Sequence, residues 1–118
     1  MTNKIWLSSP HMGGNEMRYV QLAYDTNWVA PLGPNVIGFE TALEKYISND
    51  VKVACLSSGT SAIHLALILA GIKKDDEVLC QSFTFAATVN PIVYQGAKPI
   101  FIDSEINTWN MCPVALEN

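Results

Sequence analysis

The sequence has little charge, few cysteines and few histidines. Only 15% of its 118 residues are charged, with seven Lys and Arg against eleven Asp and Glu, and no basic cluster occurs. We therefore expect no binding to nucleic acid or to an anionic membrane surface. The three cysteines show no C-x-x-C spacing, and with only two histidines the sequence predicts no metal site.

The three cysteines are Cys55, Cys80 and Cys112. Cys55 and Cys80 lie in apolar runs, so we expect both to be buried free thiols. Free thiols fit a reducing cytoplasm. The first residues, MTNKIWLSSPHMGG, contain no apolar run long enough for a signal peptide, which also favours a cytoplasmic protein.

Two long stretches, 53–72 and 78–97, contain no charged residue. Their length alone would allow a membrane span. Each stretch is interrupted by polar turn residues, SSGTS (57–61) in the first and QSFT (81–84) in the second. We therefore expect a strand, a turn and a helix in each stretch, and no membrane segment.

Hydrophobic residues make up 49% of the chain, which is enough for the core of one domain. In the first part, apolar residues at helical spacing predict helices over about 15–26 and 35–48. The loop NWVAPLGPN (27–35) separates these helices, and Asn49-Asp50 is expected to end the second one.

From residue 51 onward the predicted elements alternate. We expect strands at VKVACL (51–56), EVLCQ (77–81) and KPIFID (98–103), helices over about 60–70 and 86–95, and a further helix at the C-terminus. This alternation indicates an α/β fold with a mostly parallel sheet and flanking helices. The helix over 60–70 is apolar nearly all round and is expected to end at Gly71. Such a helix is predicted to be buried inside a structure larger than these 118 residues.

Polar turns follow the predicted strands, where open α/β sheets bind their ligands. SSGTS (57–61) follows the first strand, SFTF (82–85) the second and DSE (103–105) the third. SSGTS also begins a helix, and the free N–H groups at a helix start can bind phosphate. An ordinary N-cap is the alternative, since serine and threonine often cap helices without any ligand.

Common nucleotide and nucleophile motifs do not explain SSGTS. The sequence has no G-K-[ST], no G-x-G-x-x-G and no G-x-S-x-G at this position. In SFTF, Phe85 would place an aromatic ring at the same sheet edge, although core packing is the alternative for this ring. A phosphate site beside an aromatic ring suits a planar phosphorylated ligand such as pyridoxal phosphate.

Several stretches together resemble the amino-terminal part of the DegT/DnrJ/EryC1/StrS sugar aminotransferases. They are LSSPHMGGNE, NWVAPLGPNVIGFE, SSGTSAIHLAL, DEVLCQSFTFAATVNPIVYQGAKPIFIDSE and TWNM. The resemblance covers essentially the whole chain and is closest to the branch that aminates UDP-linked 4-keto sugars in bacillosamine-type and exopolysaccharide synthesis. It implies the start of the large domain of a fold type I pyridoxal-phosphate enzyme.

The resemblance also implies roles for single residues. Thr60 and Ser61, through their amides and the Thr60 hydroxyl, would cradle the cofactor phosphate, with Gly59 allowing close approach of the backbone. Phe85 would stack on the cofactor pyridine. Asn27 and Trp28 would lie near the sugar-nucleotide site and the dimer interface, with a structural turn as the alternative for both.

Two further polar residues are expected to be structural. Asp103 matches a family position at the end of a strand, where capping of a turn is favoured over catalysis. His64 lies in an apolar helix and is expected to be a hydrogen-bonded core histidine.

The family needs a lysine that forms a Schiff base with the cofactor, and in relatives this lysine lies beyond the last residue of this chain. None of the six lysines here lies in a matching motif, so we assign no catalytic residue and expect the chain alone to be inactive. They are Lys4, Lys45, Lys52, Lys73, Lys74 and Lys98. We expect residues 1–118 to form one incomplete domain, with a helical segment and loop at 1–50 and the start of the cofactor-binding α/β domain at 51–118, truncated at the C-terminus.

For the full enzyme, the resemblance implies a homodimer that transfers an amino group from glutamate to a 4-keto nucleotide sugar in polysaccharide or glycan biosynthesis. Two alternatives remain open. The chain could be a non-catalytic binding or interaction module that keeps the first half of the fold. It could also belong to another pyridoxal-phosphate class, such as a lyase or desulfurase.

Overall fold

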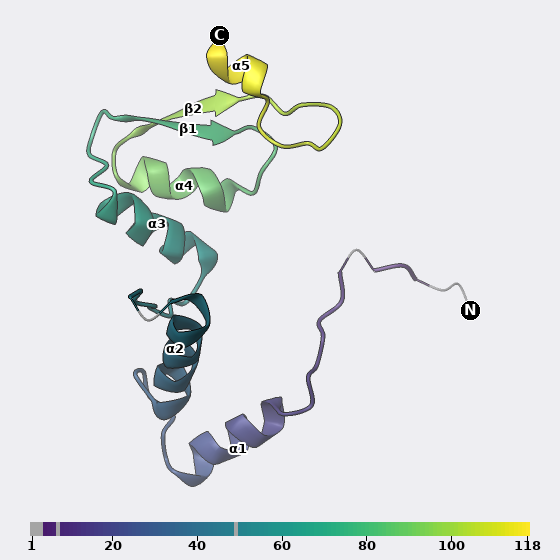
Figure 1. Ribbon diagram of the computed structural model, residues 1–118, viewed down its shortest axis with the longest axis vertical. Helices are drawn as coiled ribbons and strands as arrows, with labels where there is room; N and C mark the ends of the chain where they lie inside the picture. Colours follow the sequence, from purple (N-terminus) through teal and green to yellow (C-terminus); the bar gives the residue numbers. More distant parts are fainter. Residues whose placement is uncertain (1–3, 7, 49) are drawn as a thin grey trace. The chain divides into compact units, whose positions relative to one another are not determined.

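The computed structural model describes residues 4–6, 8–48 and 50–118, which form two compact units, 1–55 and 56–118 (Figure 1). Residues 1–3 and 7, within the stretch tested for a signal peptide, lie outside the described residues. So does Asn49, which was expected to help end the second helix. No helix in the described part of the chain has both the length and the apolar character needed to cross a membrane.

The first unit contains helices α1 (Glu16–Asp25) and α2 (Pro34–Ile47), close to the predicted ranges. Helix α1 ends in a Schellman motif, in which the Trp28 N–H donates to the Ala23 carbonyl at 2.7 Å and the Asn27 N–H to the Tyr24 carbonyl at 3.0 Å. Asn27 has φ 55°, the left-handed conformation that this motif requires. These hydrogen bonds therefore fix the direction in which the backbone leaves α1 and enters the loop 27–33.

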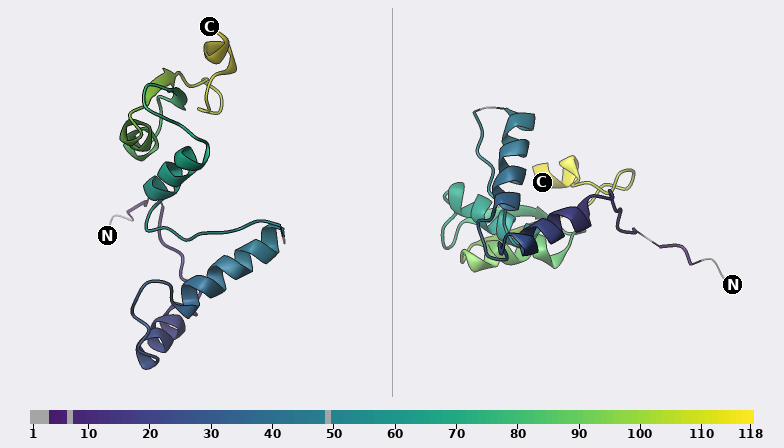
Figure 2. Two further views of the ribbon diagram at one scale, coloured as in Figure 1. Left: turned by 90° about the vertical axis from the view of Figure 1, so that its left-hand side faces the viewer. Right: turned by 90° about the horizontal axis from the view of Figure 1, so that it is seen from below.

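The predicted strand at 51–56 was wrong, because this segment forms no strand in the structure. Its chain runs back along α2 (Figure 2), and its amides bond to that helix instead. The Val53 N–H donates to Glu44 Oε1 at 3.2 Å, and the Cys55 N–H donates to Glu40 Oε1 at 2.7 Å. Since no described strand lies beside the segment, Cys55 is exposed, and its prediction as a buried thiol was also wrong.

The second unit alternates helices and strands. Its elements are α3 (Gly59–Leu69), β1 (Glu77–Gln81), α4 (Ala86–Tyr94), β2 (Lys98–Ile102) and α5 (Pro113–Glu117). Strands β1 and β2 pair in parallel, with Glu77 opposite Lys98 and Gln81 opposite Ile102. Helix α4 connects them and packs on both strands and on α3. These elements confirm the predicted α/β fold with a parallel sheet and flanking helices.

A small core holds the second unit together. Its buried hydrophobic residues are Cys80, Ile92, Ala97 and Ile102. Burial raises the pKa of the Cys80 thiol, which is the buried thiol that the sequence predicted. Pro91 is fully buried inside α4, so its ring fills core space at a helix position where it cannot donate a hydrogen bond.

Helices α3 and α4 end in the same Schellman motif, each with a glycine in the left-handed conformation, Gly71 at φ 79° and Gly96 at φ 72°. In α4, the Ala97 N–H donates to the Ile92 carbonyl at 3.2 Å, and both side chains lie in the core. Gly71 therefore ends α3 as predicted. The predicted burial of α3 inside a larger structure stays a prediction, because no α3 residue is buried within this chain.

Candidate functional site

The carboxyl ends of β1 and β2 and the amino ends of α3 and α4 lie at the same end of the second unit (Figure 1). A parallel strand pair with a crossover helix has this geometry, because the chain returns along the helix before it enters the next strand. The SSGTS and SFTF turns therefore both belong to this end of the unit.

The first turn of α3 is partly capped by its own side chains. Ser58 is the N-cap, and its Oγ accepts the Ser61 N–H at 3.2 Å and lies 3.0 Å from the Ser61 hydroxyl. The N-cap interpretation of SSGTS is thus correct for Ser58. The amides of Gly59 and Thr60 have no acceptor among residues 4–6, 8–48 and 50–118. These two groups point from the positive end of α3.

The space in front of α3 is open. A Cβ atom added at Gly59 would meet no atom within 4 Å, and Gly59 itself is exposed. Thr60 and Ser61 are both half-buried. An anion could therefore approach the free amides without displacing any residue of the second unit.

Phe85 occupies the N-cap position of α4, where its side chain makes no capping hydrogen bond, and the residue is 86% exposed. The core-packing alternative for Phe85 is therefore wrong within this unit. Phe83, Thr84 and Phe85 line a pocket of about 430 Å³. Thr60 does not line this pocket, so the convergence of Thr60 and Phe85 on one ligand stays a prediction.

Asp103 caps a turn, as the sequence predicted. His64 is hydrogen-bonded as expected, but it is only half-buried and lies outside the core of this unit. The His64 ring is half-buried, shares a hydrogen bond between its Nε2 and the side-chain amide of Gln95, and meets the Tyr94 ring edge-on at 5.6 Å between centroids. Asp103 Oδ1 accepts the N–H of Ser104 at 2.8 Å, which caps the turn after β2.

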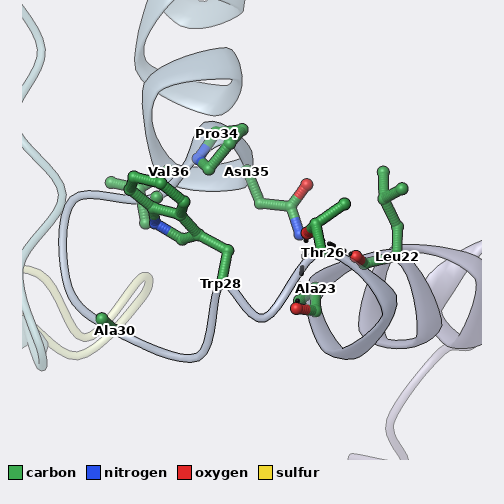
Figure 3. A pocket seen from close by; sticks show the side chains of 9 residues that line it. Leu22, Ala23, Thr26, Trp28, Ala30, Pro34, Asn35 and Val36 are labelled. Atoms are coloured by element: carbon green, nitrogen blue, oxygen red, sulfur yellow. Dashed lines mark hydrogen bonds between the residues drawn. The ribbon is translucent and has the colours of Figure 1, made fainter.

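Asn27 and Trp28 differ in what they can do. Asn27 occupies the left-handed position that ends α1, which is the structural-turn alternative. The Trp28 ring instead forms one wall of a pocket of about 320 Å³ in the first unit (Figure 3). Gly33 is buried beside it, and any side chain there would overlap the indole ring. The other walls include Leu22, Ala23, Thr26, Pro34 and Val36.

The lysines of the second unit lie away from the candidate site. Lys98 is the first residue of β2, and Lys73 and Lys74 precede β1, so all three are at the amino ends of the strands. No group of three or more potential metal ligands comes together in the described part of the chain.

Sequence reasoning missed a contact beside the SFTF turn. The Gln81 side chain donates to the Ser104 hydroxyl at 2.8 Å, and the Trp109 ring lies 5.3 Å from the Phe83 ring. The TWNM stretch contained Trp109, but no local pattern in the sequence connects it with Gln81 or Phe83, because Gln81 and Trp109 are 28 positions apart in the sequence.

Residues 10–118 match the DegT/DnrJ/EryC1/StrS aminotransferase family. The chain is 56% identical over 118 residues to EpsN of Bacillus subtilis, whose name describes a pyridoxal phosphate-dependent aminotransferase; the match covers 99% of this chain and 30% of EpsN. It is 37% identical over 114 residues to the GDP-perosamine synthase of Caulobacter vibrioides, covering 97% of this chain and 30% of that protein. The chain thus spans 30% of the length of these curated relatives.

Solved structures show the same relationship. The sugar aminotransferase Spr1654 of Streptococcus pneumoniae, in its PLP form, matches with a TM-score of 0.82 and 29% identity over 96% of this chain and 28% of that chain. The E. coli GDP-4-keto-6-deoxy-D-mannose-3-dehydratase with bound hydrated PLP matches with a TM-score of 0.82 and 25% identity over 94% of this chain and 30% of that chain. These neighbours support pyridoxal phosphate as the cofactor. The chain belongs to the DegT/DnrJ/EryC1/StrS aminotransferase family.

Proposed function

We propose that this chain is the amino-terminal part of a pyridoxal-phosphate-dependent aminotransferase that transfers an amino group from glutamate to a 4-keto nucleotide sugar. The product would serve polysaccharide or glycan biosynthesis. The observation that carries the proposal is the pair of free amides, Gly59 and Thr60, at the strand-end side of the unit where Phe85 is exposed. The names of EpsN and of GDP-perosamine synthase support the reaction and the sugar substrate.

The residues present fit the phosphate and the ring of the cofactor. The amides of Gly59 and Thr60, with the Thr60 hydroxyl, would hold the phosphate at the positive end of α3. Ser61 can donate its amide only if the Ser58 hydroxyl rotates away, which would cost about 1 kcal/mol of capping. The exposed ring of Phe85 would cover the pyridine and keep water from it. When bound, pyridoxal phosphate supplies an electron sink for the reaction.

For the nucleotide sugar we propose the Trp28 pocket. The flat indole ring offers a stacking surface for a base, and its position is set by Gly33 behind it. Asn27 would contribute indirectly: the turn that it forms at the end of α1 sets the direction in which the backbone enters Trp28.

We further propose that the 118-residue chain has no transaminase activity by itself. The reaction needs a lysine that holds the cofactor covalently and moves a proton. The lysines of the second unit lie at the other ends of the strands, so none of them can reach a ring held at Phe85. In this proposal, residues 1–118 are one incomplete domain, divided at residue 50 into a helical segment and the start of the cofactor-binding part, and the complete enzyme is a cytoplasmic homodimer.

The test is to express the complete gene and to purify the protein without added cofactor. We expect a visible absorption band of bound pyridoxal phosphate that glutamate removes. Addition of a UDP-linked 4-keto sugar should restore the band and give an amino sugar, detected by mass spectrometry. A protein that neither retains the cofactor nor responds to glutamate would refute the proposal and favour a non-catalytic binding module.

Another pyridoxal-phosphate reaction is the second candidate function. The dehydratase structure matches this chain with the same TM-score, 0.82, as Spr1654, so the fold of this region does not distinguish the two reactions. The same assay separates them, because a dehydratase product has lost water and contains no new nitrogen.

A further inference from the structure

The segment that follows β2 forms a loop closed by its own hydrogen bonds. Ser104 and Met111 pair as an antiparallel bridge. Within the loop, the Glu105 carboxylate accepts the N–H groups of Asn107 and Thr108, each at 2.8 Å, and also the Thr108 hydroxyl. The loop 103–112 therefore has a fixed shape although most of its residues are exposed.

Gln81, the last residue of β1, attaches this loop to the sheet. Its Nε2 donates to the Ser104 Oγ at 2.8 Å and to the Trp109 carbonyl oxygen. Both amide hydrogens of Gln81 can thus be used. Trp109 itself has φ 61°, a conformation that costs energy for a large residue, and its N–H is held by the Glu105 carbonyl at 3.1 Å. The Trp109 backbone is therefore held from two sides.

The Trp109 side chain connects this fixed backbone to the SFTF turn (82–85). Its ring lies against Phe83, with centroids 5.3 Å apart and planes tilted by 47°, within the range of favourable aromatic pairs. Phe83 is 66% exposed and Phe85 is 86% exposed, so neither ring is held by the core. The contact with Trp109 consequently restrains a turn that the core leaves free.

We propose that Gln81 and Trp109 are positioning residues for Phe85, and that they set how firmly a planar phosphorylated cofactor is held at the SFTF turn. The inference rests on the proposed function, because Phe85 must be the ring that covers the cofactor. Phe83 and Phe85 line the same pocket, separated by Thr84 alone. The contact of Trp109 with Phe83 therefore reduces the range of orientations that Phe85 samples before the cofactor binds. Less binding free energy is then lost in ordering the Phe85 ring.

The first measurement is hydrogen–deuterium exchange on the protein from the complete gene, without cofactor. Gln81→Met keeps the length of the side chain and removes both donors, and Trp109→Ala removes the ring but leaves Gln81 in place. We expect both variants to speed exchange in peptides covering 82–85 and 103–112 by about tenfold. Trp109→Phe, which keeps an aromatic ring, should restore protection, and Gln95→Met is the matched control because Gln95 bonds to His64 and not to this loop.

The second measurement is binding of pyridoxal phosphate, followed by its induced circular dichroism. Gln81→Met and Trp109→Ala should raise Kd about threefold to tenfold and weaken the dichroic band, while Trp109→Phe and Gln95→Met should stay within about twofold of the parent protein. Faster exchange with an unchanged Kd and band would mean that the loop only stabilises the fold, and would overturn the inference. Unchanged exchange would show that no restraint exists.

The two measurements also separate this inference from the proposed function. If the parent protein retains no pyridoxal phosphate, the proposed function fails and the positioning role fails with it. Exchange alone then decides whether Gln81 and Trp109 restrain the turn. If the parent binds the cofactor and Gln81→Met and Trp109→Ala bind it equally well, the proposed function stands and the positioning role is wrong.

Discussion

The two units of the chain are stabilised in different ways. The second unit has a core of Cys80, Ile92, Ala97 and Ile102, and its helices end in glycine turns that return apolar residues to that core. In the described part of the first unit, the only buried residue is Gly33, and large apolar side chains such as Tyr46, 87% exposed, face outward. Tertiary burial thus stabilises the second unit, whereas the described part of the first unit depends mainly on hydrogen bonds within its helices, at their C-terminal ends and in its loops.

The strongest test of this contrast is a matched pair of isoleucine truncations. Ile92→Ala removes a side chain that is 2% exposed and should lower the free energy of unfolding by about 2–4 kcal/mol. Ile37→Ala in α2 removes one that is 54% exposed and should cost less than about 1 kcal/mol, measured by urea denaturation. Equal losses at the two positions would show that the first unit has a core of its own.

A second test uses two glycines of the first unit. Gly33→Ala would drive a methyl group into the Trp28 ring and should cost about 1–3 kcal/mol, with a shift in tryptophan emission. Gly38→Ala, inside α2 with no atom within 4 Å of the new methyl, should stabilise the helix by up to about 1 kcal/mol. If both substitutions changed the free energy of unfolding in the same direction, the position of the Trp28 ring would not depend on Gly33.

A third test concerns cofactor retention by the second unit. In the protein from the complete gene, Thr60→Ala and Phe85→Ala should each weaken pyridoxal phosphate binding by about fivefold, which corresponds to about 1 kcal/mol for one phosphate contact or one ring stack. Thr41→Ala, at an exposed position of α2, is the control. The prediction fails if dialysis removes cofactor from the parent and from both site variants at the same rate.

The smallest expected effect is on pH dependence, where each unit offers one carboxylate. The Thr108 hydroxyl, followed by the Asn107 amide, lowers the pKa of Glu105 below its usual 4.5. The backbone N–H of Glu16 itself, followed by those of Gly13 and Gly14, lowers the pKa of Glu16. A lowered pKa in the folded state stabilises the ionised form, so this contribution is present above pH 4.5 and is lost as the pH falls below it.

Acidification should therefore lower the protection factors at 103–112 and at 13–16, taken as the intrinsic exchange rate at each pH divided by the observed rate. Both effects should be modest because neither carboxylate is buried. Glu105→Gln should remove the pH dependence at 103–112 only. If 103–112 loosens with the same midpoint in that variant, the Glu105 bonds do not control the loop.

Local sequence signals predicted most of the fold. Helical spacing and the glycine stop at Gly71 correctly located the helices. The predicted strands at 77–81 and 98–103 form the parallel pair, in which β2 ends one residue earlier, at Ile102. The failure at 51–56 has a physical reason, since a strand forms only beside another strand and the sequence pattern cannot report whether one is present. Cys55 was assigned to the interior on the same assumption.

The candidate site was predictable only in part. The N-cap at Ser58 and the position of Phe85 at a helix start follow from residue types close in sequence. The sequence could not show that the Ser61 amide already donates to the Ser58 hydroxyl, because this bond depends on the side-chain rotamer of Ser58. The hydrogen bond from Gln81 to Trp109 joins residues 28 positions apart in the sequence, so it could be identified only from the folded structure.

The way α2 holds the segment 51–55 also bears on solubility. Two carboxylates four residues apart on a helix are about 6 Å apart along its axis, and alternate amides of an extended chain repeat at about 6.8 Å. Glu40 and Glu44 can therefore act as surrogate acceptors for the amides of Cys55 and Val53. A valine-rich segment with free amides is a template on which other molecules can add as strands. With the amides of Val53 and Cys55 occupied and two carboxylates alongside, we expect this segment to pair less readily with other chains than a segment whose amides are free.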